Sequence, residues 1–405
     1  MNAQALSGLK VLEYGEFVAA PYCGKLLADL GADVIKIEKP VTGDRARENG
    51  PFPQDKPHPE KSGLFLYLNT NKRGVTLDLK KAAGRKVFQQ LVRWADVLIE
   101  NNPRQDLPKL GLDYETLREI NPKLVVTSIT YFGHTGPYRD YKGCDLVANH
   151  VSVEAFLNPC YEVYNEDLNP PMKLPGHSGD FLSGVIAAIN TMSAVFVAQQ
   201  TGAGQHIDLS EQEAVASIIC HEVGDYFDAG ITYLRDRKYR WEESPKYPCS
   251  DGFIMMNIPF QFWEGVVRMM DSPEWAQNPE YKTPVGLLHD HWKEIQPRLI
   301  AWFKQHTCAE VVKRAQAQRL DIAIVASAKE MSENKMFEER GFFVEIDHKE
   351  AGRLKFPGAP CKFSATPAQT PHAAPLLGEH NAEIYSGMLG FKPAKLAKLQ
   401  ESGVI

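Results

Sequence analysis

Short β-branched segments alternate with helical segments over the first 130 residues. The strand-like segments are residues 9–14, 33–38, 97–100 and 124–130, with helical patterns at residues 21–30, 82–94 and 114–120. Neighbouring strands that are separated by a helix run parallel, so this alternation predicts a doubly wound α/β sheet. In such a sheet, ligands bind beyond the carboxyl ends of the strands.

The loop after the first strand, GEFVAAPYCG, does not carry a nucleotide-binding signature. It lacks GxGxxG, and the chain contains no GxxxxGK[ST]. We therefore predict a Rossmann-like fold without a dinucleotide motif. Residues 39–62 form a long connection rich in proline, glycine and charge, which is typical of a segment that covers a ligand or a partner.

A charged, irregular segment at residues 233–246 indicates a domain boundary. Strand and helix patterns resume beyond it and predict a smaller α+β domain, whereas the C-terminal residues have too few apolar side chains to fold alone. We predict a large Rossmann-like domain from residues 1–228, a small domain from 229–328, and a tail from 329–405 that completes the large domain.

The charge and composition exclude several classes of function. The chain has 405 residues, of which 43% are hydrophobic, and a formal net charge of −6, so no basic field recommends nucleic acid or an anionic membrane. We expect no apolar run of the roughly 20 residues that a membrane span needs, and no signal peptide in MNAQALSGLK, hence a cytoplasmic protein. The seven cysteines never form CxxC, and no histidine spacing suggests a metal site.

Asp180 stands between glycines ahead of a long apolar run at helical spacing, which predicts that it is the first residue or the N-cap of a helix. One interpretation is structural, because aspartate is a preferred N-cap. The other is catalytic, because a carboxylate at the positive end of a helix can act as a nucleophile. Asp145 is similarly ambiguous, as a loop acid, a cap or a functional group.

Five phrases of the sequence, in order, resemble the class III CoA-transferases, the CaiB/BaiF or formyl-CoA and carnitine CoA-transferase family. They are GLKVLEYGEFVAAPYCGKLLADLGADVIKIEKPVTGD, NTNKRGVTLDLKKAAGRKVFQQLVRWADVLIEN, LGLDYETLREINPKLVVTSITYFGHTGPY, TGAGQHIDLSEQEAV and APLLGEHNAEI. The resemblance spans essentially the whole chain. It implies an interlocked homodimer in which the tail belongs to the large domain.

The resemblance also implies the chemistry. The family nucleophile matches Asp180 in SGDFLSG. Its carboxylate would attack an acyl-CoA thioester and form a mixed anhydride, then an aspartyl-CoA thioester from which a free organic acid takes the CoA. Coenzyme A would be a substrate, with no metal or tightly bound cofactor.

Contacts to CoA carry over to the positions that match the family's motifs. Asp145 stands where the family has a glutamate, in a segment that reaches the thioester end of CoA. The lysines would pair with phosphates. The matching CoA-binding positions are Val18, Ala19, Lys39, Leu77, Asp78, Leu79, Lys80, Asn101, Asn102, Lys109, Lys142, Gly143 and Cys144.

Two departures bear on the substrate. Val18 replaces a glutamine of some transferases, and residues 251–263 lack the family's glycine run, which makes a formyl-CoA and oxalate pair doubtful. That segment instead holds a methionine and aromatic set that either lines an acyl pocket or belongs to a core. The set comprises Met255, Met256, Phe260, Phe262 and Trp263.

Two other functions stay open. The related α-methylacyl-CoA racemases use a His and Asp pair to move a proton next to the thioester. Their aspartate matches Asp180, but their histidine falls on Cys144, which argues against racemisation. A catalytically silent CoA-binding subunit is the second alternative, and an intact Asp180 argues against it.

Overall fold

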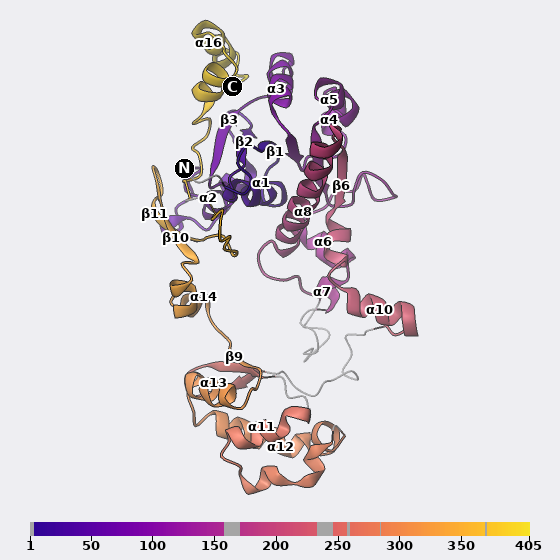
Figure 1. The fold of residues 1–405 in the computed structure, drawn as a ribbon, viewed down its shortest axis with the longest axis vertical. Coiled ribbons are helices and arrows are strands. Elements are labelled where there is room, and N and C mark those ends of the chain that lie inside the picture. The colour runs from indigo at the N-terminus through magenta and orange to yellow at the C-terminus, as the bar shows by residue number, and fades with distance from the viewer. Residues whose placement is uncertain (1–3, 158–170, 233–245, 257–259, 284, 369–370) are drawn as a thin grey trace. The chain divides into compact units, whose positions relative to one another are not determined.

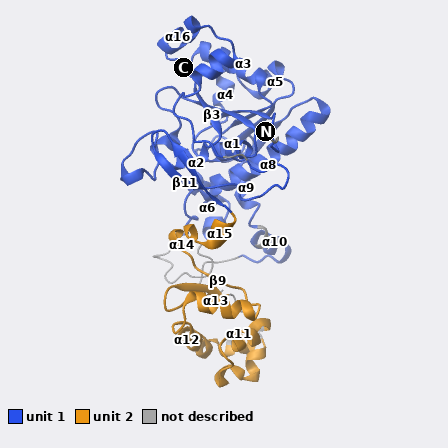
Figure 2. Cartoon of the chain, turned by 60° about the vertical axis from the view of Figure 1, so that its left-hand side comes forward, with its two compact units in different colours: residues 1–156, 171–232, 341–405 blue, residues 157–170, 233–340 orange. Residues whose placement is uncertain are grey.

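The computed structural model describes residues 4–157, 171–232, 246–256, 260–283, 285–368 and 371–405. The chain forms two compact units (Figure 2). The larger takes its described residues from the ranges 1–156, 171–232 and 341–405, and the smaller from 157–170 and 233–340.

The larger unit is built on a six-stranded sheet in which every strand pairs in parallel with its neighbours (Figure 1). The strand order is β3 (Lys72–Thr76), β2 (Asp33–Glu38), β1 (Lys10–Tyr14), β4 (Val97–Glu100), β5 (Val125–Thr130) and β6 (His206–Ser210). The predicted Rossmann-like sheet is confirmed. The sequence analysis missed edge strand β3, KRGVT, because its polar residues hide the strand pattern.

Helices cover both faces of this sheet, with α3 (Ala82–Trp94) on one face and α1 (Ala19–Asp29) and α8 (Ser178–Thr201) on the other. The other helices described with it are α2 (Gly63–Leu68), α4 (Asp106–Lys109), α5 (Tyr114–Ile120), α6 (Asp145–Val151), α7 (Glu154–Leu157), α9 (Glu211–Ala216), α10 (Cys220–Ala229) and α16 (Pro393–Glu401), with 3₁₀ turns at Arg45–Glu48 and Pro53–Asp55 and a π-helical turn at Ala382–Met388.

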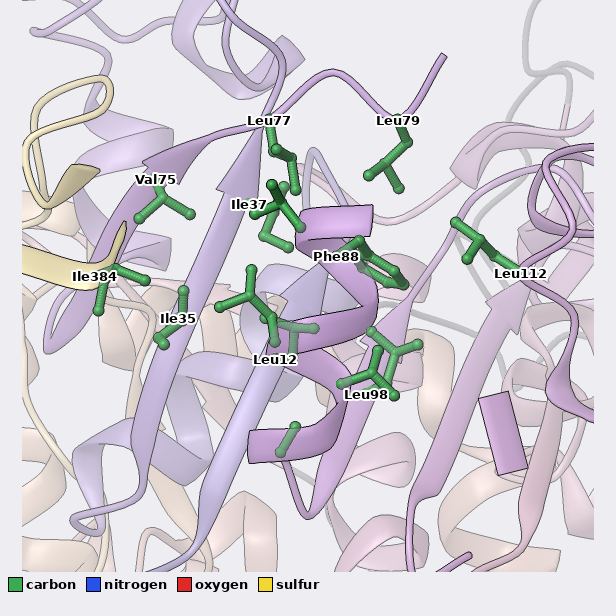
Figure 3. Close-up of a cluster of buried hydrophobic side chains, with 14 of the residues drawn as sticks. Leu12, Ile35, Ile37, Val75, Leu77, Leu79, Phe88, Leu98, Leu112 and Ile384 are labelled. Atoms are coloured by element: carbon green, nitrogen blue, oxygen red, sulfur yellow. The ribbon is translucent and has the colours of Figure 1, made fainter. Parts of the chain in front are cut away.

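Alternate residues of the central strands enter two separate cores. Leu12, Ile35 and Leu98 point to one face, where they pack around Phe88 of α3 (Figure 3). Their neighbours Val11, Val34 and Val97 point to the other face, toward α1 and α8. A parallel sheet that is buried on both faces needs apolar side chains at successive positions, and this is why these strands are evident in the sequence.

The smaller unit combines an antiparallel sheet with helices, as the α+β prediction requires. Its strands are β7 (Lys246–Pro248), β8 (Phe253–Met256) and β9 (Ile322–Ile324). Its helices are α11 (Trp263–Met269), α12 (Trp292–Phe303), α13 (Cys308–Ala317), α14 (Ala328–Ser332) and α15 (Lys335–Glu339), with short 3₁₀ or π turns at Phe260–Phe262, Glu274–Gln277, Pro279–Lys282 and Gly286–Asp290.

The C-terminal part of the chain packs on the larger unit. It begins with a hairpin of β10 (Phe343–His348) and β11 (Gly352–Pro357). The following segment covers the edge strand β3, because the Thr76 N–H donates to Asn381 Oδ1 (2.9 Å) and the Tyr385 hydroxyl donates to the Thr76 carbonyl (2.8 Å). The Asp78 N–H then donates to the Val404 carbonyl at 2.8 Å.

Helix α8 is long and apolar enough to cross a bilayer by length and composition, so the expectation that no such run exists is wrong. A core helix passes the same test. Small residues such as Gly184, Ala187 and Thr191 are buried where α8 packs on α1 and β5, whereas Ile189 and Phe196 are exposed.

A network of buried charges ties β1 and β2 to the loops that follow them. Lys36 is fully buried, and its Nζ lies 2.9 Å from Glu13 Oε1 and 2.8 Å from Asp44 Oδ2. Lys72 Nζ lies 2.8 Å from the other Glu13 oxygen. Gly24 of α1 sits directly over Glu13, where an added Cβ would overlap Oε2. The sheet thus carries a charged centre that helix α1 seals from water.

Removing one charged side chain of this network should destabilise the folded protein. We expect Lys36→Ala to lower the free energy of unfolding by about 3–5 kcal/mol, because Glu13 and Asp44 are then left buried without a partner. Lys86→Ala, at an exposed position of α3, is the control and should change it by less than about 0.5 kcal/mol. Chemical denaturation measures both, and equal losses would contradict the prediction.

Candidate active site

Asp180 is the third residue of α8, so the prediction that it is the first residue or the N-cap is wrong. The helix begins at Ser178 with His177 as N-cap. The Asp180 side chain is 2% exposed, and neither of its oxygens accepts a hydrogen bond from an N–H group of the described residues. A carboxylate buried in the first turn of a helix without capping it is available for chemistry.

Asp145 performs the capping that was expected of Asp180. It is the buried first residue of α6, and its Oδ1 accepts hydrogen bonds from the N–H groups of Gly179 (2.9 Å) and Asp180 (3.2 Å). Its Oδ2 lies 2.7 Å from Lys173 Nζ. Asp145 is therefore not a solvated loop acid, because it fixes the first turn of α8.

Gly179 is required by this contact. A Cβ at that position would lie 2.9 Å from Asn149 Nδ2 and 3.0 Å from Asp145 Oδ1. Both distances are too short for a carbon atom, so a side chain there would push α6 and α8 apart. The glycine before Asp180 serves the approach of Asp145.

Glu211, which the sequence analysis missed, completes a cluster of three buried carboxyl groups. It is the first residue of α9, is 3% exposed, and its carboxyl group interacts with that of Asp180. Burial, and then the charges of Asp180 and Asp145, raise the pKa of Glu211 well above its ordinary value. The one signal in the sequence is an acid directly after β6, at the carboxyl edge of the sheet.

His177 also lies next to Asp180, although no pattern in the sequence assigned it a chemical role. Its Nδ1 lies 3.5 Å from Asp180 Oδ2, and its ring meets the ring of Phe17 edge-on at 4.7 Å. Phe17 has φ of 73°, a left-handed conformation that costs energy in a bulky residue. Its N–H donates to Asp44 Oδ1 at 2.8 Å. The buried charge network therefore holds the loop that contacts the Asp180 cluster.

Several predicted CoA-binding residues lie at the carboxyl ends of β1, β2 and β4. Lys39 and Asn102 line a small crevice of about 20 Å³ together with residues of β1 and β2. Asn101 holds the loop after β1, because its side chain accepts from the Glu16 N–H (2.9 Å) and donates to the Glu16 carbonyl (2.8 Å). These residues thus belong to one edge of the sheet.

The side chains of four predicted residues are not available to a ligand. Val18 and Ala19 are buried around the start of α1, and Leu77 and Leu79 belong to the core around Phe88 (Figure 3). Only their backbone atoms remain as possible contacts. The remaining predicted residues are exposed or partly exposed, namely Asp78, Lys80, Lys109, Lys142, Gly143 and Cys144.

Over the described ranges, no group of three or more His, Cys, Asp and Glu side chains has the geometry of a metal site. Lys173 lies beside Asp145 and His177 beside Asp180, and the raised pKa of Glu211 favours its protonated form.

The proton on Glu211 should make stability depend on pH. The folded protein keeps it above pH 4.3, about where glutamate ionises in the unfolded chain, so stability falls as pH rises from there to the folded-state pKa. Because Glu211→Gln removes this linkage, we expect its stability relative to wild type to increase by about 1.4 kcal/mol per pH unit in that window.

Denaturant unfolding between pH 5 and 8 measures this effect. Glu213→Gln, at an exposed position of the same helix, is the matched control and should follow the wild type. Parallel curves for wild type and Glu211→Gln would contradict a protonated Glu211.

Comparison with known proteins bears out the resemblance read from the sequence. The model of CoA-transferase family III matches residues 6–381. A formyl-CoA:oxalate CoA-transferase of Rhodopseudomonas palustris (strain TIE-1) is 31% identical, over 99% of this chain and 97% of its own. A succinate–glutarate CoA-transferase of Agrobacterium fabrum is 31% identical over 94% of both chains.

Solved structures agree with these relatives. The crystal structure of a CaiB/BaiF family protein from Brucella suis superposes with a TM-score of 0.82 at 27% identity, covering 96% of this chain and all of the other. The family match extends over nearly the whole chain and the fold matches as well, so this protein belongs to CoA-transferase family III.

Proposed function

We propose that this enzyme transfers coenzyme A from an acyl-CoA to a free carboxylic acid, with Asp180 as the nucleophile. The observation that carries the proposal is the state of Asp180. It is a buried carboxyl group in the first turn of a helix, and its oxygens have no hydrogen-bond partner among the described residues, although Glu211 and His177 lie nearby. Family membership supports the reaction.

The reaction would proceed by exchange at three carbonyl carbons, those of the donor, of Asp180 and of the acceptor. An Asp180 oxygen attacks the thioester carbonyl, the C–S bond breaks, and a mixed anhydride and CoA thiolate result. The thiolate attacks the aspartyl carbonyl and releases the first acid, leaving an aspartyl-CoA thioester. The acceptor carboxylate attacks that thioester, its C–S bond breaks, and a second mixed anhydride and the thiolate result. The thiolate then attacks the acceptor's acyl carbon, which forms the new acyl-CoA and releases the Asp180 carboxylate. Covalent catalysis thereby divides a difficult exchange into easier steps.

The exposed cations at the carboxyl edge would hold the nucleotide part of CoA. Lys39, Lys80 and Lys109 are exposed and can pair with phosphates. Lys142 to Cys144 directly precede Asp145 and would lie beside the thioester end. Backbone atoms at Val18, Ala19 and the segment Leu77–Leu79 would complete the contacts, with Asp78, Asn101 and Asn102 at the same edge.

We also propose a cytoplasmic homodimer. The predicted domains, a large one of residues 1–228 and 329–405 and a small one of residues 229–328, differ from the two compact units mainly at residues 229–232, which group with the larger unit, and at residues 329–340, which group with the smaller. Exposed apolar residues on α8 and α10, among them Phe196, Tyr226 and Phe227, support a surface that another copy covers. Light scattering that gave the mass of a single 45.4 kDa chain would oppose the dimer.

The donor and acceptor acids should be sought by testing both small dicarboxylic acids and bulkier acids. The relatives' names include oxalate, glutarate and D-citramalate. Met256 and Trp263 belong to the core of the smaller unit, so they do not support an apolar acyl pocket, whereas Met255 and Phe262 are exposed.

A second candidate is proton exchange at the carbon next to the thioester. It is favoured by one contact, the 3.5 Å between His177 Nδ1 and Asp180 Oδ2, which brings a histidine to Asp180 from a position other than Cys144. Such a pair could remove and return a proton. The two reactions leave different products in D₂O.

We expect Asp180→Ala to lower CoA transfer at least about 10³-fold, because the nucleophile is lost, while CoA binding persists. Mass spectrometry of a panel of acyl-CoAs and acids in D₂O measures new thioesters and deuterium at the α-carbon. Asp140→Ala, an exposed aspartate, is the control. Full activity of Asp180→Ala would overturn the assignment, deuterium without exchange would favour the second candidate, and an inactive wild type would indicate a silent subunit.

We expect Asp145→Ala to slow transfer about 10- to 100-fold, because the N–H groups of Gly179 and Asp180 lose their acceptor and the first turn of α8 is no longer fixed. Asp145→Asn keeps an oxygen for those N–H groups and should retain more activity. The initial rate of acyl-CoA formation checks the order, and an Asp145→Ala rate equal to wild type would contradict it.

A further inference from the structure

We propose that Glu211 is a positioning residue that donates its carboxyl O–H to Asp180 and stabilises the oxyanion formed at the Asp180 carbonyl during transfer. This inference rests on the proposed role of Asp180 as nucleophile.

The backbone around Glu211 directs its side chain to the start of α8. Ser210 caps α9 by accepting from the Glu213 N–H at 3.3 Å, and the Gln212 N–H donates to the Tyr131 carbonyl at 3.1 Å. Val215 of the same helix contacts Gly179, since a Cβ there would lie 3.3 Å from Val215 Cγ2. Helix α9 is thereby fixed on both sides, and Glu211 faces Asp180 without needing to move.

Among the described residues, the cations near this cluster belong to the other acids. Lys173 pairs with Asp145, and His177 lies next to Asp180. Burial, and then the charges of Asp180 and Glu211, raise the pKa of Tyr131, so its hydroxyl stays neutral. Two buried carboxyl groups in contact are stable only if they share one proton.

The proton belongs on Glu211. Burial, followed by the negative charges of Asp180 and Asp145, raises the pKa of Glu211. Glu211 Oε2 and both Asp180 oxygens are buried without a hydrogen-bond partner among the described residues. A proton on Glu211 would let the two carboxyl groups satisfy each other through one O–H···O bond.

The donor would act at the step in which thiolate attacks the anhydride. The S–C bond forms at the aspartyl carbonyl, and the electron pair of the C=O bond moves to the Asp180 oxygen. The Glu211 O–H donates to this oxyanion. The C=O bond then re-forms while the bond to the anhydride oxygen breaks, and the carboxylate of the first acid leaves. Glu211 keeps its proton throughout, so no acid or base is consumed.

Paired variants test this role. Glu211→Gln retains an N–H donor that cannot titrate, whereas Glu211→Ala removes the donor. We expect kcat to fall about 10²-fold or more in Glu211→Ala and less than about 10-fold in Glu211→Gln, with Glu213→Gln unchanged. The proposal would be overturned if the kcat of Glu211→Ala equalled that of the wild type. It would also be overturned if the kcat of Glu211→Gln fell as far as that of Glu211→Ala.

An infrared measurement tests whether Glu211 holds the proton that this role requires. Infrared difference spectra of the wild type against Glu211→Gln at pH 7 should contain the band of one buried protonated carboxyl group, and its absence would overturn the proposal. Glu100, whose pKa burial also raises, is present in both proteins, so its band cancels in this comparison.

Mass spectrometry of the Asp180 peptide distinguishes this proposal from the proposed function itself. With acyl-CoA, wild type and Glu211→Ala should both carry a covalent CoA adduct on Asp180, which forms more slowly in the variant. No adduct in the wild type would refute the nucleophile, whereas an equally fast adduct in Glu211→Ala would refute only the role of Glu211.

Discussion

The contact on which the larger unit depends is the buried ion pair between Lys36 and Glu13, in the middle of the parallel sheet. Lys36 also bonds to Asp44 and to the Gly15 carbonyl, and Asp44 in turn accepts from the Phe17 N–H. The loop after β1 is thus fixed from the centre of the sheet. Buried ion pairs often add little net stability, but they impose one arrangement, because any other leaves a charge unpaired.

The same principle assigns unequal roles to the three acids of the site. Asp145 has Lys173 and two backbone N–H groups, Asp180 has His177 nearby, and the described neighbours of Glu211 that shift its pKa are the other two acids. Chemically similar groups can therefore differ in function because their surroundings differ. In the proposed mechanism, the acid held by donors is a structural anchor, the acid without a hydrogen-bond donor reacts, and the acid with the raised pKa donates.

The sequence predicted those parts of the structure that local pattern determines. Strands such as β2 were evident because they are apolar on both faces, and β3 was hidden by Lys72 and Arg73. The bounds of α8 were misjudged by two residues, since its capping oxygen comes from Asp145, distant in sequence. Glu211 could not be found because only the fold brings β6 beside Asp180. The nucleophile itself was proposed from family resemblance, since spacing alone left it undecided.

The approach of α1 to the sheet links a glycine to a charge. Gly24 leaves just enough space for the Glu13 carboxylate, which a methyl group would occupy. In evolutionary terms, the residues at positions 13 and 24 should covary. A lineage that keeps Glu13 cannot admit alanine at position 24, and one that loses the charge gains room for a larger residue there. Substitutions at these two positions should therefore be inherited together, although ten residues lie between them in the chain.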